Sequence, residues 1–141
     1  AMYFIVVKFE TKPEWTDRWL GLVQDFTEAT RAEPGNKWFD WSRSVENPHE
    51  FVLVEAFTED GAGPHVNSEH FKAAMHVMPQ ALARTPKIIS RQISGDDWDA
   101  MGELTMVLIC ATIHPWRALE SSPAMIETFD PRNQPAAPCS S

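Results

Sequence analysis

Two titratable side chains stand out in this 141-residue sequence because of where the chain places them. His65 follows a loop rich in glycine and proline, and lies near the predicted start of a helix. The positive end of the helix dipole disfavours a second positive charge, so this imidazole should stay neutral and can act as a base. The alternative for His65 is a capping or loop-packing role.

Glu55 is the only charge inside the apolar run Phe51 to Phe57 of a predicted strand. A buried carboxylate must be paired, or its pKa must rise. Glu55 therefore either orients a histidine or holds a substrate hydroxyl, or it forms a structural salt bridge with Arg43 on the neighbouring strand. The two interpretations remain open at this point.

Signatures of several other chemistries are missing from the sequence. Cys110 and Cys139 do not form a Cys-x-x-Cys pair, so a structural zinc site is not expected. His65 and His70 are five residues apart, and His70 and His76 are six apart, whereas metal-binding pairs on a helix favour four. We also find no glycine-rich phosphate loop and no Gly-x-Ser-x-Gly motif. The sequence therefore predicts no metal and no nucleotide cofactor.

The overall composition limits the partners. Twelve Lys and Arg stand against 20 Asp and Glu, which gives a net charge of −8 and argues against nucleic acid or an anionic membrane as a partner. The longest apolar run, Leu104 to Ile113, is shorter than the roughly 20 residues of a membrane helix. Together with an N-terminus that does not resemble a signal peptide, this predicts a soluble, cytoplasmic protein.

The hydrophobic pattern predicts four strands and two helices. One helix is expected to begin at a capping box, Thr11-Lys12-Pro13-Glu14, and to end before Glu33. The other should begin near Asn67 or Ser68, and Pro79 should kink or restart it. Its apolar face would be Phe71, Ala74, Met75, Met78 and Leu82. The predicted strands are Tyr3–Phe9, Lys37–Val45, Glu50–Thr58 and Pro86–Ser94.

This order is β-α-β-β-α-β, which predicts the α+β class with a ferredoxin-like, split β-α-β antiparallel sheet. Both helices would cover one face of that sheet. The first and third strands do not alternate cleanly between apolar and polar residues, so the other face must also be covered. A second copy of the chain is the simplest cover, and the expected assembly is a homodimer with its sheets packed face to face.

Residues 2–104 are predicted to form this domain, and residues 105–141 a C-terminal extension. The apolar run Leu104 to Ile113 is compatible with an extra strand. Five prolines after His114 then predict a Pro-rich, disordered tail.

Four segments together resemble the antibiotic biosynthesis monooxygenase family, and its quinol monooxygenase group most of all. They are Arg31-Ala32-Glu33-Pro34-Gly35-Asn36, Phe39-Asp40-Trp41-Ser42-Arg43-Ser44, Val54-Glu55-Ala56-Phe57 and His65-x-x-Ser68-x-His70-Phe71-Lys72. The resemblance implies a dimeric α+β barrel. It also implies oxidation of a hydroquinone or polycyclic phenol by O₂ as co-substrate, without flavin, haem or metal.

The resemblance also suggests roles for individual residues. His65 would be the base, Glu55 would orient it or anchor a hydroxyl, and Asn67 or Arg43 would stabilise the anion that forms. The aromatic substrate would lie against Trp38, Phe39, Trp41, His70, Phe71 and Met75.

Two alternatives remain within the same resemblance. Related barrels act in stress responses or bind small molecules without known catalysis. The haem-degrading branch uses an Asn on the first strand, where this chain has Val7-Lys8-Phe9, and a Trp where this chain has His65. Only His76, next to the position of the iron-binding histidine, supports that branch.

Overall fold

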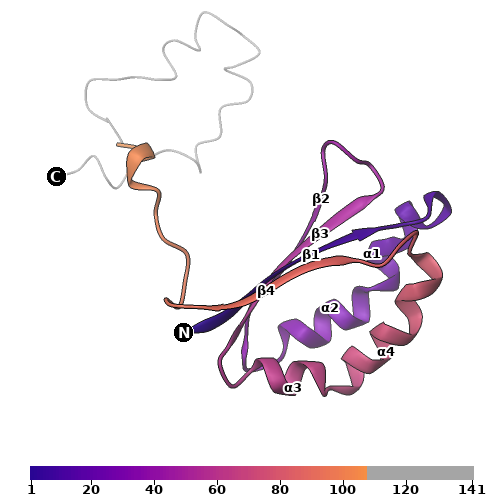
Figure 1. Cartoon of the computed structure of the whole chain (residues 1–141), viewed down its shortest axis with the longest axis horizontal. Coiled ribbons are helices and arrows are strands. Elements are labelled where there is room, and N and C mark those ends of the chain that lie inside the picture. The colour runs from indigo at the N-terminus through magenta and orange to yellow at the C-terminus, as the bar shows by residue number, and fades with distance from the viewer. Residues whose placement is uncertain (108–141) are drawn as a thin grey trace, which may run out of the picture. The chain divides into compact units, whose positions relative to one another are not determined.

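In a computed structural model, residues 1–107 of the chain are described, and Ala1–Asp97 form one compact unit. This unit is built on a four-stranded sheet in the order β2-β3-β1-β4 (Figure 1). Every pair of neighbouring strands is antiparallel. The strands are β1 (Met2–Glu10), β2 (Asn36–Arg43), β3 (Glu50–Thr58) and β4 (Lys87–Ile93). All four predicted strands and the predicted ferredoxin-like α+β fold are confirmed.

The helices lie together on one side of the sheet (Figure 1). The segment expected to be one helix from Thr11 is divided into η1 (Pro13–Arg18), α1 (Trp19–Leu22) and α2 (Gln24–Arg31). The predicted capping box is wrong, because the Thr11 hydroxyl bonds to Thr16 Oγ1 at 2.8 Å instead of capping the helix.

The second helical segment is also divided, into α3 (Ala62–Val66), α4 (Glu69–Val77) and η2 (Met78–Ala81). Ser68 caps α4, since its hydroxyl accepts a hydrogen bond from Phe71 N at 3.1 Å. The restart at Pro79 is confirmed as the turn of η2. On the predicted apolar face, Met75 is the exception, with 45% of its surface exposed.

Aromatic side chains fill the core between helices and sheet. Trp19 is fully buried, and its ring centroid lies 5.2 Å from that of Phe9 and 6.0 Å from that of Trp41. Phe26 packs edge-on against Phe39 at 5.4 Å. Burial of rings on this scale is the main stabilising contribution available to a chain of this size.

The opposite face of the sheet carries a row of apolar residues. Val6 pairs with Val54 on one side and with Ile89 on the other. Because side chains alternate along a strand, this row points away from the core residues Val7 and Leu53. Ile89 is 63% exposed. The expected dimer would cover this face, and it stays a prediction.

The C-terminal expectations are only partly covered by the described residues. A second unit begins at Trp98, and its η3 (Gly102–Leu104) is a single 3₁₀ turn. Leu104 therefore does not start a strand, and residues 105–107 have no regular structure. The rest of the expected strand and the Pro-rich tail lie outside the described residues. Within residues 1–107, no helix has the length and apolar character needed to span a membrane.

Candidate active site

One carboxylate oxygen joins two histidines at the end of the sheet where β2 begins and β3 ends. Glu33 Oε2 lies 2.8 Å from His65 Nδ1 and 2.5 Å from His70 Nε2. We call these three residues the Glu33 cluster. His65 is 4% exposed, whereas the side chains of Glu33 and His70 are 13% and 25% exposed. The cluster is therefore buried at His65 and reaches the surface at His70.

A close contact between two turns positions this cluster. Gly35 at the start of β2 touches Gly61 before α3, and a Cβ added to Gly35 would lie only 2.5 Å from Gly61 Cα. Thr58 N also donates to Gly35 O at 2.9 Å. Because no side chain separates the two backbones, Glu33 on one turn can reach His65 beyond the other.

His65 and His70 do not share a helix. His65 is in the last turn of α3 and His70 is in the first turn of α4, with the Ser68 cap between them. The spacing argument assumed that both histidines lie on one helix, so it does not apply to this pair. The helix-dipole argument for His65 is also wrong, because the imidazole sits at the C-terminal end of a short helix. Carboxylates surround it instead.

The second nitrogen of His65 faces Glu55. The distance from Nε2 to Glu55 Oε1 is 3.8 Å, too long for a hydrogen bond. The Glu33 carboxylate only accepts hydrogen bonds, so Nδ1 of His65 is the donor in this contact. In the neutral form of the imidazole, the lone pair would then be on Nε2, the nitrogen that faces Glu55. Burial raises the pKa of Glu55 to about 7, and the negative charge of Glu33 adds to the increase.

Aromatic rings enclose the buried imidazole. The His65 ring centroid lies 4.5 Å from Phe57, 5.2 Å from Phe71 and 5.7 Å from Phe26. This environment excludes water, which strengthens every electrostatic interaction at the imidazole. An imidazole next to a second carboxyl group in such surroundings is placed as a general base would be.

The predicted catalytic residues fall into two groups. His65 and Glu55 come together, but Arg43 and Asn67 do not join them. Arg43 pairs with Phe51 toward the other end of β3, and its Nε donates to Pro48 O at 2.8 Å. Asn67 is exposed, and its amide donates to Gly63 O at 2.9 Å. The suggested salt bridge between Glu55 and Arg43 is also wrong.

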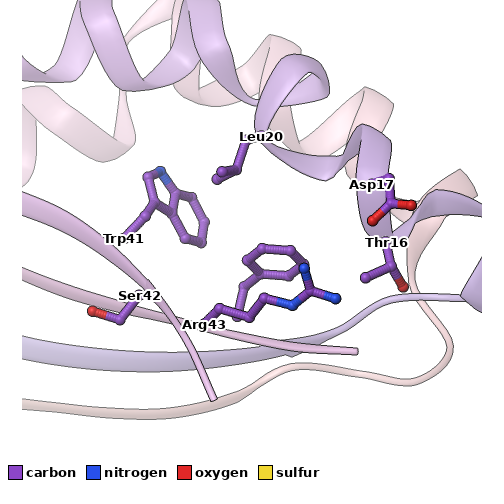
Figure 2. A pocket seen from close by; sticks show the side chains of 7 residues that line it. Thr16, Asp17, Leu20, Trp41, Ser42 and Arg43 are labelled. Atoms are coloured by element: carbon purple, nitrogen blue, oxygen red, sulfur yellow. The ribbon is translucent and has the colours of Figure 1, made fainter. Parts of the chain in front are cut away.

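The predicted aromatic pocket is likewise divided. Phe71 lies beside His65, but Phe39 is buried in the core and Met75 is exposed. Trp38 precedes Phe39 on β2 and points to the opposite face of the sheet, because side chains alternate along a strand. Trp41 lines a separate cavity of about 250 Å³ beneath η1 (Figure 2), together with Thr16, Asp17, Leu20, Ser42, Arg43 and Phe51.

Glu33, which contacts both histidines of the candidate site, was not singled out by sequence reasoning. It lies at a turn predicted by the proline and glycine of Glu33-Pro34-Gly35, and within one of the segments that carry the family resemblance, but no role was assigned to it. An acidic residue at a turn is ordinarily a surface residue. The signal that could have found it is the antiparallel pairing of β2 with β3, which brings this turn next to the loop that leads to His65.

Known proteins support this architecture. The family model for antibiotic biosynthesis monooxygenases matches residues 2–77. A solved structure described as a candidate antibiotic biosynthesis monooxygenase from Nitrosomonas europaea is 27% identical, with a TM-score of 0.60, over 64% of this chain and 88% of that one.

Two further structures share the fold. A candidate antibiotic biosynthesis monooxygenase from Caulobacter crescentus is 21% identical, with a TM-score of 0.63, over 67% of this chain and 92% of that one. A conserved protein from Methanosarcina mazei is 23% identical, with a TM-score of 0.62, over 66% and 93%. No curated protein matches the chain. The match to the family model spans more than half of the sequence, and the chain belongs to the antibiotic biosynthesis monooxygenase family.

Proposed function

We propose that the protein oxidises a hydroquinone or a related polycyclic phenol with O₂, and that His65 is the base. The observation that carries this proposal is the environment of His65. Its ring is buried, its Nδ1 is held by Glu33 at 2.8 Å, and its Nε2 faces Glu55 at 3.8 Å. Family membership supports monooxygenase chemistry, and the site supports an acidic hydroxyl as the group that reacts.

The first step is removal of the hydroxyl proton. A phenol seated between the two groups would donate to His65 Nε2, and the Glu33 carboxylate would stabilise the imidazolium that forms. Glu33 also keeps the ring in the one orientation that aims Nε2 at the substrate. This is the role of the carboxylate in catalytic triads.

The phenolate formed in this way is electron-rich enough to reduce O₂ directly. For a hydroquinone, one oxygen atom enters the ring and the other leaves as water, so hydroquinone and O₂ give a hydroxyquinone and water. The substrate supplies all the electrons, so we propose that the reaction needs no flavin, haem or metal. The protein contributes the base, the dry surroundings and the groups that hold the anion.

Glu55 is the group that anchors the substrate in this proposal. It is 6% exposed, and its Oε1 has no hydrogen-bond partner among the described residues. A substrate hydroxyl would give this oxygen the partner that it lacks. In its protonated form Glu55 can also donate a hydrogen bond to the phenolate, which replaces the role first suggested for Asn67 or Arg43.

We also propose that the working unit is a homodimer. The apolar row of Val6, Val54 and Ile89 on the open sheet face supports it, because a monomer would leave that row in water.

The test is O₂ uptake with a panel of hydroquinones and polycyclic phenols. We expect wild-type protein to consume O₂ above the uncatalysed rate, and His65→Ala to reduce kcat by about 10²- to 10⁴-fold. His76→Ala is the matched control, because this exposed histidine on α4 lies outside the site. Circular dichroism would check that each variant is folded. No activity with any substrate would favour a binding protein without turnover, and full activity in His65→Ala would remove it as the base.

A second variant separates positioning from folding. Glu33→Gln keeps the size of the side chain but loses the charge that stabilises the imidazolium. We expect kcat to fall by about tenfold or more while KM changes little, because the ground-state contacts of the substrate remain. If the fall in kcat is fully explained by a loss of folded protein in this variant, the role of Glu33 is purely structural.

A further inference from the structure

We propose that the Glu33 cluster binds one divalent transition-metal ion of the Zn²⁺ type, and that the protein with this ion bound is inactive. The binding site stands on the geometry alone. The inhibition rests on the proposed function, because it requires His65 to be the base.

The donor atoms have the right chemistry and lie close together. One nitrogen each from His65 and His70 and one carboxylate oxygen of Glu33 all lie within 4.8 Å of one another. Two imidazoles and a carboxylate suit Zn²⁺ and its neighbours in the transition series, whereas Mg²⁺ and Ca²⁺ prefer oxygen ligands. Three protein ligands also leave a fourth position for water.

Two unpartnered oxygens support the site independently. Glu33 Oε1 and Glu55 Oε1 are buried and have no hydrogen-bond partner within the described part of the chain. An ion bound to Glu33 Oε2 would bring a positive charge close to Glu33 Oε1 and could give this oxygen a partner. It would also make His65 Nε2 a donor toward Glu55 Oε1, now 3.8 Å away. Metal-binding histidines nearly always donate their other N–H to a carboxylate in this way.

The cluster reaches the surface at His70. The side chain of His70 is 25% exposed, while His65 lies behind it with 5% exposure. The three ligands come from three separate segments. Glu33 lies in the turn after α2, His65 lies in α3, and His70 lies in α4. The contact of Gly35 with Gly61 and the Ser68 cap fix these segments, so little ordering is needed on binding.

Metal binding and base catalysis exclude each other at His65. The ion would take the Nδ1 lone pair, so the ring proton would move to Nε2. That nitrogen is the proposed proton acceptor, and once it carries a proton it cannot take one from a phenol. Zn²⁺ should therefore inhibit the oxidation reversibly, and a chelator should restore it.

The test is calorimetric titration of ZnCl₂ into the full-length protein after treatment with a chelator. We expect one ion per chain for the wild type, and an affinity at least about tenfold lower for His70→Ala. His70 is partly exposed, so this variant should fold. His76→Ala, on the same helix but outside the cluster, should bind like the wild type.

Two results would overturn the site. One is the absence of saturable binding in the wild type. The other is equal affinity in the wild type and His70→Ala combined with loss of binding in a Cys110→Ser, Cys139→Ser variant, which would place the ion at the cysteines.

The titration needs no turnover, so the two proposals can fail separately. Zn²⁺ binding that depends on His70, in a protein that oxidises no phenol, would keep the metal site and reject the proposed function. Oxidation that needs His65 but continues unchanged in the Zn²⁺-bound protein would reject the inhibition.

Discussion

At the scale of residues, the central feature is a carboxylate oxygen that is shared by two imidazoles. Glu33 Oε2 contacts His65 Nδ1 at 2.8 Å and His70 Nε2 at 2.5 Å, so it engages one nitrogen of His65 and leaves Nε2 facing Glu55. A single acidic residue at a turn thereby determines which nitrogen of a buried histidine would be the base in the proposed reaction. Glu55 faces the other nitrogen of His65 at 3.8 Å, and its Oε1 makes no hydrogen bond within the described residues. Glu33 therefore positions the imidazole, whereas Glu55 is available to a substrate in the proposed reaction.

The raised pKa of Glu55 predicts how stability depends on pH. Burial raises this pKa from an ordinary value of 4.5 to about 7, so between these values the unfolded chain loses a proton that the folded chain keeps. Rising pH therefore favours unfolding, by on the order of 3 kcal/mol once the pH is above both values. Glu33 and His65 are the titratable groups that face Glu55.

Glu55→Gln removes this dependence, because the amide stays neutral. We expect the free energy of unfolding of Glu55→Gln, relative to wild type, to rise between about pH 4.5 and 7 and to level off above. Urea unfolding across this range, with EDTA present, measures it. A difference between the two proteins that is constant with pH would show that Glu55 does not titrate as described.

At the scale of elements, the turns before β2 and before α3 are held together by their backbones. A Cβ on Gly61 would lie 2.7 Å from Gly35 Cα and 2.8 Å from Gly35 O, and these are backbone atoms that cannot easily move away. We expect Gly61→Ala to destabilise the fold by about 1–3 kcal/mol, as other overpacked sites do. It should also weaken the contact of Glu33 with His65, and so lower kcat.

Gly63→Ala is the matched control for this prediction. Gly63 lies in α3, two residues further along, and a Cβ there would meet nothing within 4 Å. Alanine in a helix is favoured over glycine, so this variant should be as stable as wild type or more so. Thermal unfolding compares the two, and equal melting temperatures for both variants would contradict the importance of the close contact.

The sequence predicted the strands better than the site, for a physical reason. Strands such as Glu50–Thr58 follow from local hydrophobic pattern and turn residues, and the structure has this strand with the same bounds. The helical segments were harder, because the hydroxyl of Thr11 prefers a tertiary contact with Thr16 to a cap. The local sequence pattern does not determine which distant segments come into contact.

The candidate site shows the same limit. His65 and Glu55 were found because each is unusual in its own surroundings. Arg43 was placed with them because it shares a strand pair with Glu55, but the register puts it toward the other end of β3. Glu33 was missed because its importance depends on a contact between distant glycines.

At the scale of the whole molecule, the open face of the sheet allows a sharp test of the proposed dimer. Ile88 and Ile89 are neighbours on β4 with nearly equal exposure, 62% and 63%, but they point to opposite faces. We expect Ile89→Glu to convert the dimer to a monomer, because it would place charges between the two sheets.

Ile88→Glu should leave the dimer intact, because this residue points to the side of the helices. Light scattering coupled to size-exclusion chromatography would distinguish the chain mass of 16.0 kDa from twice that value. A wild-type protein that elutes as a monomer would refute the proposed assembly. If both variants are monomers, the effect does not depend on which face of the sheet carries the new charge, and the open face is not identified as the interface.

Strand β3 takes part in both faces of the molecule. Its residues alternate, so Glu55 points toward His65 while Val54 and Ala56 point to the open face. One stretch of backbone thus fixes the anchor of the proposed substrate and carries the surface offered to a second copy. Because both faces share this backbone, a shift of the strand caused by contacts on one face also moves the side chains on the other. The proposed dimer would therefore hold in place the strand that carries Glu55, and loss of the partner should loosen the candidate site before it unfolds the chain.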